Sequence, residues 1–211
     1  MKITLIGTGN MGAGFVKQLT KAGHQVRVTG RDLSKARALA NAHPGATAVA
    51  VEDAVSDSEV VILATGYADA VSALQSAGQS IRGRVIVDIT NPLTPDYMGL
   101  TLGHSTSAAE QIAAAVPGAY VVKAFNTILA QVLAEGAEFG GGNVASVFYA
   151  GDNEHAKQVV HSVAESMGFT AVDAGPLKNS RYLEPMGGLN VYFAYAAGHG
   201  TDIAPIWIKR T

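Results

Sequence analysis

Three glycines near the start of the chain have the spacing of a phosphate-binding turn. They lie in the segment Gly7-Thr8-Gly9-Asn10-Met11-Gly12. Gly7 permits a tight turn, Gly9 has no side chain that would block a pyrophosphate, and Gly12 lets the following helix pack close to a strand. The first N–H groups of that helix would then point at the phosphates. We therefore expect a dinucleotide to bind at Gly7, Thr8, Gly9, Asn10, Met11 and Gly12.

A second turn, which reads Thr29-Gly30-Arg31-Asp32, indicates which dinucleotide is bound. A site for NAD usually has an acidic residue at the end of this strand, where it holds the ribose 2′-hydroxyl. This chain has Thr29 there instead, and Arg31 can hold a 2′-phosphate in a charge-assisted pair. Lys35 adds a second positive charge, whereas Asp32 stands where a helix cap belongs. The cofactor is therefore expected to be NADP(H), bound in part by Thr29, Gly30, Arg31 and Lys35.

Polar residues also follow the next two long apolar runs, as Thr65-Gly66 and Asn91-Pro92. Ligands of open α/β sheets bind beyond the carboxyl ends of the strands. We therefore expect Thr65 and Gly66 to lie near the adenosine, and Asn91 and Pro92 to lie near the nicotinamide. Ordinary turn chemistry explains the same residue types equally well, so this alternative stays open.

These motifs need elements that bring them together, and the hydrophobic pattern of the chain provides them. Short apolar runs alternate with helical stretches, which is typical of βαβ units and a mainly parallel sheet. Several runs are apolar throughout, as expected for strands that are covered on both faces. We predict strands at 2–6, 25–29, 46–50, 59–64, 84–88, 119–123, 145–150 and 169–173. The expected fold class is α/β, with a Rossmann-type, doubly wound and mainly parallel sheet.

The end of the chain has a different pattern. From about Leu177 the apolar spacing becomes purely helical, and Pro185 is expected to kink or restart the helix. We therefore divide the chain into an NADP-binding Rossmann domain, 1–176, and a C-terminal helical cap, 177–211. The cap is also expected to form a dimer contact. Before it, Ser107 followed by Glu110 predicts a capping box at the start of another helix.

The composition limits the classes of function. Of the 211 residues, 48% are hydrophobic and 15% are charged, and the net charge is −2. This is typical of a packed globular protein and gives no electrostatic reason to expect a nucleic-acid partner. The absence of cysteine fits a cytoplasmic location. No apolar run is long enough for a secretory signal or a membrane span, and the six histidines do not cluster. We therefore expect neither a membrane partner nor a metal site.

Further motifs resemble those of the F420-dependent NADP reductase family. They are Val87-Asp88-Ile89-Thr90-Asn91-Pro92, Val122-Lys123-Ala124-Phe125-Asn126-Thr127, and Asp173-Ala174-Gly175-Pro176-Leu177 running on to Ser180-Arg181. Together with the glycine turn and the Arg31 turn, they extend the likeness over nearly the whole chain. The chain is also similar to the nucleotide-binding domains of the STEAP metalloreductases. Asn126 looks more like the metalloreductase version of the second motif, because the archaeal F420 enzymes have a histidine there.

The resemblance implies an enzyme that transfers hydride between NADPH and a deazaflavin (F420) or a flavin. This small-molecule acceptor would lie over the nicotinamide, between the Phe125-Asn126-Thr127 turn and the C-terminal helices. Asn126 and Thr127 would orient a polar ring edge, and Phe125 would contact the acceptor. Arg181 would hold an anionic tail, and His104 is a further candidate contact. Relatives of this short form commonly form homodimers through the C-terminal helices.

Three alternatives stay open. A non-catalytic NADP(H) sensor or binding module could use the same fold, because fold alone does not establish activity. An imine or pyrroline reductase is a rival enzyme, although it usually carries a longer helical C-terminal domain than the stretch after Leu177. Arg181 could also form an ordinary surface pair with Glu184 on the same helix.

Overall fold

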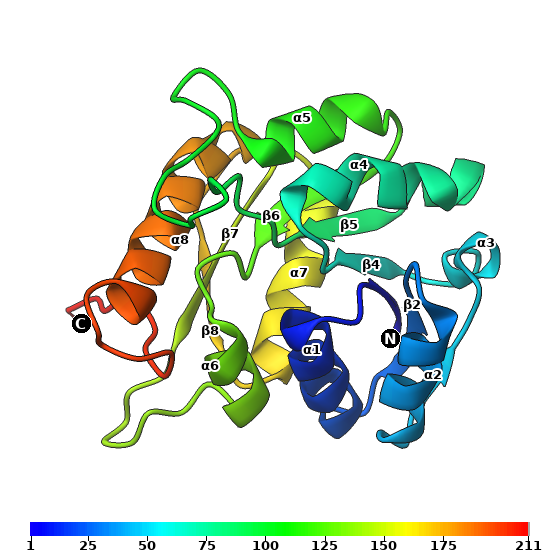
Figure 1. The fold of residues 1–211 in the computed structure, drawn as a ribbon, viewed down its shortest axis with the longest axis horizontal. Coiled ribbons are helices and arrows are strands. Elements are labelled where there is room, and N and C mark those ends of the chain that lie inside the picture. Colours follow the sequence, from blue (N-terminus) through cyan, green and yellow to red (C-terminus); the bar gives the residue numbers. More distant parts are fainter. Residues whose placement is uncertain (211) are drawn as a thin grey trace.

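Eight short strands form one sheet in the computed structural model, which describes residues 1–210 (Figure 1). The strand order is β3-β2-β1-β4-β5-β6-β7-β8, and all neighbouring pairs are parallel except β6 with β7. The strands are β1 (Lys2–Ile6), β2 (Gln25–Thr29), β3 (Ala46–Ala48), β4 (Val60–Leu63), β5 (Val85–Asp88), β6 (Tyr120–Ala124), β7 (Ser146–Gly151) and β8 (Thr170–Asp173). The predicted fold class is confirmed, and every predicted strand is present to within two residues at each end.

Helices cover both faces of the sheet because the strands alternate their side chains between two apolar cores. In β4, Val60 and Ile62 face one core, whereas Val61 and Leu63 face the other. The first core is covered by α1, α2, α6 and α7, and the second by α3, α4 and α5. The helices are α1 (Asn10–Lys21), α2 (Leu33–Asn41), α3 (Val51–Ala54), α4 (Tyr67–Ser76), α5 (Ala108–Ala115), α6 (Ala130–Glu135), α7 (Glu154–Ser166) and α8 (Ser180–Tyr195).

Two predicted helix caps are present. Asp32 caps α2, since its carboxylate accepts hydrogen bonds from the backbone N–H groups of Ser34 (2.9 Å) and Lys35 (3.4 Å). Ser107 caps α5, where its hydroxyl accepts from the backbone N–H of Glu110 (3.2 Å) and donates to the Glu110 carboxylate (2.7 Å). These caps fix where α2 and α5 begin, close to the carboxyl ends of the strands.

The C-terminal part of the chain packs on the sheet next to β7. Leu183 of α8 joins Phe148 and Ala150 of β7 in a small separate apolar cluster. The helix runs without interruption from Ser180 to Tyr195, so it does not restart at Pro185, and the alternative expectation of a kink there stays a prediction. After α8 the chain returns to the sheet, where the backbone N–H of Ser146 donates to the carbonyl of Pro205 (2.9 Å).

The division at residues 176 and 177 stays a prediction, and Thr211, the last residue of the predicted cap, lies outside the described residues. Within residues 1–210, no helix combines the length and the apolar character that crossing a membrane would require. In the same part of the chain, acidic residues and histidines do not gather into a group that could hold a metal ion.

Candidate active site

A cleft of about 490 Å³ lies at the carboxyl ends of β1, β2 and β4. This is the point where the strand order reverses, with β2 on one side of β1 and β4 on the other. Dinucleotides bind at such a reversal point in doubly wound sheets. The predicted cofactor residues that line the cleft are Gly7, Thr8, Gly9, Gly30, Arg31, Lys35, Thr65 and Gly66.

The glycine turn has the geometry that a pyrophosphate requires. Gly7 has a φ of 128°, and a Cβ there would lie 2.1 Å from the carbonyl oxygen of Ala64. A Cβ on Gly12 would lie 2.3 Å from the carbonyl oxygen of Gly7, so both glycines are needed for packing. In contrast, a Cβ on Gly9 would meet no atom within 4 Å, because it would point into open space. The absence of a side chain at Gly9 therefore leaves room for a ligand rather than for the protein.

The start of α1 is also suited to an anion. Gly9 is the N-cap of α1, no side chain caps the helix, and its first turn contains no acidic residue. The first N–H groups and the positive end of the helix dipole therefore face the cleft without a competing carboxylate on the same turn. Asn10 is exposed and Met11 is half-buried at this end of the helix.

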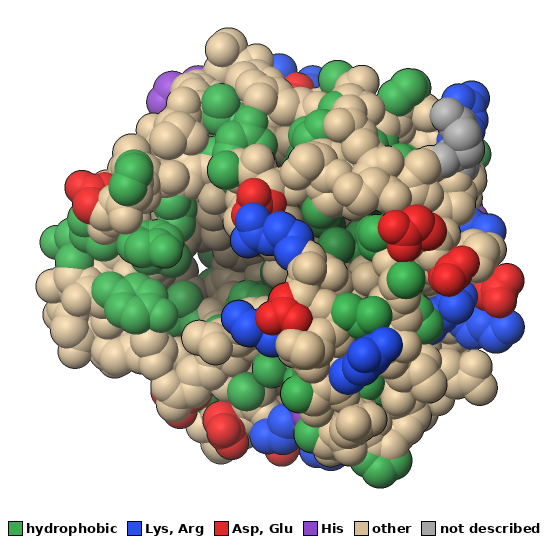
Figure 2. Space-filling view, turned by 45° about the vertical axis from the view of Figure 1, so that its right-hand side comes forward, with side chains coloured by type: hydrophobic (Ala, Val, Ile, Leu, Met, Phe, Trp, Pro, Cys, Tyr) green, Lys and Arg blue, Asp and Glu red, His purple; other side chains and the backbone are tan. Residues whose placement is uncertain are grey.

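Two cationic side chains lie at one end of the cleft, at the end of β2 and the start of α2. The Arg31 side chain is 89% exposed and forms an ion pair with Asp69 of α4, with 3.4 Å between Nη2 and Oδ2. Lys35 also lines this side. Figure 2 shows the surface hollowed between charged side chains on one side and hydrophobic side chains on the other. An exposed arginine next to a phosphate cradle can hold a 2′-phosphate, since the weak pair with Asp69 is easily exchanged.

Two asparagines, in the turns that follow β5 and β6, form hydrogen bonds with each other, and neither is among the residues that line the cleft. The Asn126 amide donates to Asn91 Oδ1 (2.9 Å) and to the carbonyl of Leu183 (2.7 Å), and the Asn91 amide donates to the carbonyl of Asn126 (2.7 Å). Helix α8 contacts this pair through Gly187, where a Cβ would lie 2.7 Å from Asn91 Oδ1. We call Asn91 and Asn126 the amide pair.

Several polar atoms of these turns have no partner among the described residues. They are the Oδ1 of Asn126 and the hydroxyl oxygens of Thr65, Thr90 and Thr127. A buried polar group without a hydrogen bond costs about 1–3 kcal/mol. The turns after β4, β5 and β6 therefore have hydrogen-bonding capacity that the fold itself does not use, which fits a site for a polar ligand.

Three of the residues that were predicted to contact a ligand are buried and do not line the cleft, namely Phe125, Thr29 and Pro92. The Phe125 side chain is fully buried, with its ring centroid 5.1 Å from that of Phe15 and 6.1 Å from that of Phe169. The predicted acceptor contact of Phe125 was therefore wrong, because this ring fills the core. Thr29 and Pro92 are also buried and do not line the cleft. Their side chains therefore lie behind the residues that form the cleft wall.

Arg181 is held by a residue that the sequence did not indicate. Its guanidinium forms two hydrogen bonds to the Glu110 carboxylate, of 2.9 Å from Nε and 2.7 Å from Nη2. These bonds hold the pKa of Glu110 below its ordinary value. The alternative pair with Glu184 is wrong, because Glu184 is buried and bonded elsewhere. Arg181 and the exposed His104 line one small cavity of about 160 Å³.

A buried ion group behind the amide pair was missed by the sequence reasoning. Lys123 of β6 is fully buried, and its ammonium contacts Asp88 (2.7 Å) and Glu184 (2.9 Å). The signal was present, since Lys123 is the only charged residue of β6 and Asp88 ends an otherwise apolar strand. A charged residue in a buried strand is rare unless it is paired.

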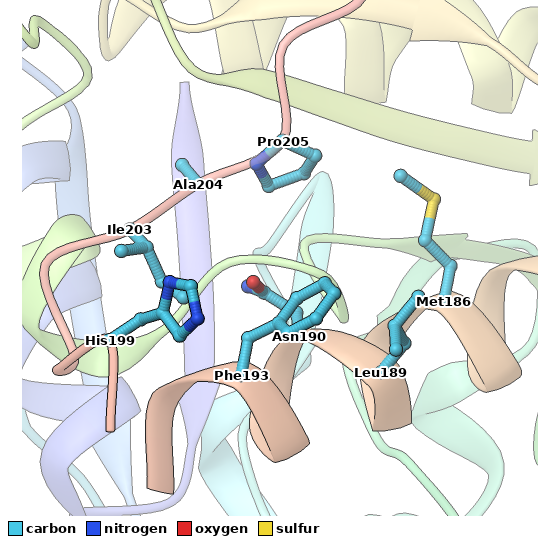
Figure 3. Close-up of a pocket in the computed structure, with 8 residues that line it drawn as sticks. All are labelled: Met186, Leu189, Asn190, Phe193, His199, Ile203, Ala204 and Pro205. Carbon is cyan, nitrogen blue, oxygen red and sulfur yellow. The ribbon is translucent and has the colours of Figure 1, made fainter. Parts of the chain in front are cut away.

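An apolar pocket of about 330 Å³ lies between α8 and the segment that follows it (Figure 3). Met186, Leu189 and Phe193 of α8 form one wall, and the segment from Ile203 to Pro205 lies across from them. Two polar side chains, Asn190 and His199, complete the lining. The Asn190 amide donates to the carbonyl of Thr127 (2.9 Å), so the pocket adjoins the turn that follows β6.

Comparison with known proteins agrees with this geometry. A family model described as "NADP oxidoreductase coenzyme F420-dependent" matches residues 2–92. The F420-dependent NADP reductase of Methanothermobacter marburgensis is 30% identical over 203 residues, which is 87% of this chain and 88% of that protein. The Metalloreductase STEAP3 of Rattus norvegicus is 33% identical over 184 residues. That match covers 87% of this chain, which spans only 36% of the length of the metalloreductase.

The fold comparison extends over the entire chain. A crystal structure of a putative F420-dependent NADP reductase from Arthrobacter sp. FB24 aligns with 100% coverage of both chains, a TM-score of 0.86 and 30% sequence identity. The likeness therefore includes α8 and the segment after it, as well as the sheet.

Proposed function

The chain belongs to the F420-dependent NADP reductase family, whose named members are NADP-dependent oxidoreductases, and from this premise we propose that it transfers hydride between NADP(H) and a flavin-like acceptor. The observation that carries the proposal is the cleft at the reversal point of the sheet. It combines an uncapped helix N-terminus, an open space over Gly9 and the exposed Arg31. These features suit a dinucleotide with a third phosphate.

Each side of the cleft has a proposed role toward NADP(H). Gly7, Gly9, Gly12 and the start of α1 bind the pyrophosphate, with Thr8, Asn10 and Met11 beside it. Arg31 and Lys35 bind the 2′-phosphate, and Thr65 and Gly66 lie along the adenosine side. The amide pair and Thr127 lie on the nicotinamide side, since β5 and β6 are on the opposite side of β1 from β2. When bound, NADPH supplies the hydride.

The acceptor is proposed to bind at the apolar pocket beside α8. Its wall of Met186, Leu189 and Phe193 suits the face of a planar ring system such as F420 or a flavin. Both N–H groups of the Asn126 amide are already donated within the fold, so only its Oδ1 is free to accept a hydrogen bond. Asn126 and Thr127 are therefore proposed to orient a polar ring edge. The protein's part in such a reaction is to hold two rings at the right distance and to exclude water.

The small cavity at the first turns of α8 is proposed to hold the tail of the acceptor. Arg181 and His104 line it, and only Nη1 of the Arg181 guanidinium is not bonded to Glu110. The Glu110 carboxylate already balances the positive charge of this guanidinium. Arg181 would therefore interact with an anionic tail mainly through a hydrogen bond and only weakly through its charge. We therefore assign to Arg181 an orienting contact with the acceptor, and to His104 a contact at the cavity entrance.

The exposed apolar residues of the C-terminal part support a homodimer. They are Tyr182, Leu189, Tyr192, Phe193, Tyr195, Ile206, Trp207 and Ile208. Large apolar patches on a protein surface often mark an interface, and these residues all come from α8 and the segment after it. A two-fold contact through α8 would place the acceptor pocket close to the second copy. A cytoplasmic location is part of the same proposal, because the chain has no cysteine.

The test is anaerobic oxidation of NADPH with one acceptor at a time, namely F420, FMN, FAD, a quinone and a cyclic imine. We expect turnover with F420 or a flavin, and much weaker turnover with NADH than with NADPH. Turnover with the imine alone would replace the proposal with an imine reductase. Tight NADPH binding without turnover of any acceptor would indicate a sensor and overturn the proposal.

The cofactor preference is tested by Arg31→Ala, with Arg37→Ala as the matched control. Both arginines are exposed, Arg31 just before α2 and Arg37 in the middle of it, but only Arg31 lines the cleft. Loss of a charge-assisted contact should weaken NADPH binding about 10- to 100-fold and leave NADH binding unchanged. Equal effects of the two substitutions, or equal effects on NADH and NADPH, would contradict the role of Arg31.

A further inference from the structure

Lys123 is a fully buried charged residue, and each N–H group of its ammonium has an acceptor. Its side chain is 0% exposed. The ammonium donates to Asp88 Oδ2 (2.7 Å) and to the carbonyl of Thr90 (2.7 Å), and it contacts Glu184 Oε1 at 2.9 Å. An ammonium has three N–H groups, and this environment provides one acceptor for each. We call Asp88, Lys123 and Glu184 the ion triad.

The second carboxylate of the triad is also held at a defined place. Glu184 accepts hydrogen bonds from the backbone N–H groups of Ala108 (2.9 Å) and Ala109 (3.1 Å), at the start of α5. Asp88 accepts from the backbone N–H of Thr90 (2.9 Å). The positive end of α5 therefore balances the excess negative charge of one lysine and two carboxylates. The triad joins β5, β6, α5 and α8 at one point.

The ion triad lies directly before the residues that contact each other at the nicotinamide side. Asp88 precedes Asn91 by three residues, Lys123 precedes Asn126 by three, and Glu184 precedes Gly187 by three. Asn91, Asn126 and Gly187 are the three residues that meet where α8 touches the amide pair. In each of these three segments, an ionic contact of the triad therefore lies three residues before the residue that takes part in the contact between α8 and the amide pair.

We propose that Lys123 is a positioning residue, which holds the amide pair and α8 in register at the nicotinamide side of the cleft without touching the cofactor. This inference rests on the proposed function. Buried ion groups are a poor source of stability, because apolar side chains of similar volume often stabilise a fold equally well or better. In some proteins a buried polar or ionic group instead specifies one arrangement of the groups that it joins. Here that arrangement is the contact of the turns after β5 and β6 with α8.

The test uses a charge-balanced variant, because Lys123→Met alone would leave two unpaired carboxylates in the core and could unfold the chain. The variant combines Asp88→Asn, Lys123→Met and Glu184→Gln. The amide oxygen of Asp88→Asn can still accept from the backbone N–H of Thr90, whereas the single amide oxygen of Glu184→Gln replaces only one of the two carboxylate oxygens that accept from Ala108 and Ala109. The matched control is Lys157→Met, which removes another nearly buried lysine that bridges two carboxylates, Glu154 of α7 and Asp173 of β8, and contacts no member of the ion triad through an ion pair.

Three readouts need no acceptor. Hydrogen exchange of the backbone amides from Leu183 to Asn190, in the nucleotide-free protein, reports how firmly α8 is held. Binding of 2′,5′-ADP reports the adenosine side, and the change of NADPH fluorescence on binding reports the order of the nicotinamide. In the balanced variant we expect exchange in α8 to be at least about 10-fold faster, the fluorescence change to be lost, and 2′,5′-ADP affinity to stay within about 2-fold.

The reaction gives a fourth readout once the acceptor is identified. Misplacement of the nicotinamide side should lower kcat about 10- to 100-fold with little change in the KM for NADPH. A folded balanced variant with unchanged α8 exchange and unchanged NADPH fluorescence would overturn the inference. Equal changes in the Lys157→Met control would also overturn it. If the balanced variant does not fold, Glu184→Gln alone must show faster α8 exchange with unchanged 2′,5′-ADP affinity. Failure of the proposed function would appear separately, as wild-type protein that oxidises no NADPH.

Discussion

At the scale of single residues, the glycines of the first turn have two separate physical roles. Gly12 is required by the fold, because a Cβ there would lie 2.3 Å from the carbonyl oxygen of Gly7. Gly9 is not required by the fold, because its missing side chain faces open space. The two positions therefore distinguish a packing requirement from a ligand requirement within one motif.

The expected outcome is that Gly9→Ala folds normally and loses NADPH, whereas Gly12→Ala loses stability first. For Gly9→Ala we expect the free energy of unfolding to change by less than about 1 kcal/mol and NADPH affinity to fall at least about 10-fold. For Gly12→Ala we expect a loss of roughly 2 kcal/mol or more, because backbone atoms must move. Urea unfolding and nucleotide titration measure both. Gly9→Ala protein that binds NADPH normally would contradict a pyrophosphate at this turn.

Single residues also show where sequence reasoning fails. Phe125 was expected to contact the acceptor because it stands in a turn beside the site. Its backbone has a φ of 59°, a left-handed conformation, and its ring lies between those of Phe15 and Phe169 in the core. The partners of Lys123 and Arg181 come from elements far away in the sequence. No local pattern contains such information, since the direction of a side chain in a turn depends on the tertiary fold.

At the scale of elements, most of the arrangement could be predicted. The strands were found because buried parallel strands are continuous apolar runs, as in the segment Val60–Leu63. The caps of α2 and α5 were found because capping depends on residues that are close in sequence. That α8 does not restart at Pro185 could not be read from the local pattern, because a proline favours a break, whereas the contacts of Leu183 with β7 and of Glu184 with β6 are tertiary.

Helix α8 provides a matched pair of glycines for a test at this scale. A Cβ on Gly187 would lie 2.7 Å from Asn91 Oδ1, whereas a Cβ on Gly188 would lie 3.6 Å from Leu93 in ordinary contact. Gly187→Ala should separate α8 from the amide pair and cost about 1–3 kcal/mol. Gly188→Ala should be neutral or should stabilise the helix by up to about 1 kcal/mol. Thermal unfolding measures both, and equal effects would contradict the close approach of α8 at Gly187.

The contact of α5 with α8 should also make stability depend on pH. The hydrogen bonds from Arg181, followed by those from Ser107, lower the pKa of Glu110 in the folded protein. A carboxylate with a depressed pKa stabilises the fold above its unfolded pKa, about 4.3 for glutamate, and loses this contribution as pH falls through the folded pKa. Urea unfolding from neutral to acidic pH should therefore show that Glu110→Gln is less stable than wild type at neutral pH. The difference should disappear in acid.

The control for that experiment is Glu52→Gln, which changes an exposed carboxylate in the first turn of α3. It removes one negative charge without touching Arg181. If Glu110→Gln and Glu52→Gln shift the pH profile equally, or if the Glu110→Gln difference is the same at every pH, the Arg181 pair contributes nothing to acid sensitivity.

At the scale of the whole molecule, polarity is distributed unevenly. Charged side chains gather around the nucleotide cleft, where Arg31, Lys35 and Asp69 lie together. Large exposed apolar side chains gather on α8 and on the segment after it, and several are more than half exposed. A stable dimer interface covers about 800 Å² on each partner, and its energy is concentrated in a few aromatic residues. Tyr192 and Tyr195 of α8 are suitable centres of such an interface.

The double substitution Tyr192→Glu and Tyr195→Glu should therefore convert a dimer into a monomer. These side chains are 48% and 66% exposed in the single chain and do not line the acceptor pocket, so folding and the pocket should be preserved. Two buried charges on a two-fold axis would be repeated by the second copy, which should weaken association at least about 100-fold. Sedimentation equilibrium of the wild type and the variant measures this change.

The matched control is Tyr120→Glu, which changes a 42% exposed tyrosine at the start of β6. A monomeric wild type, or dissociation caused equally by Tyr120→Glu, would refute a dimer through α8.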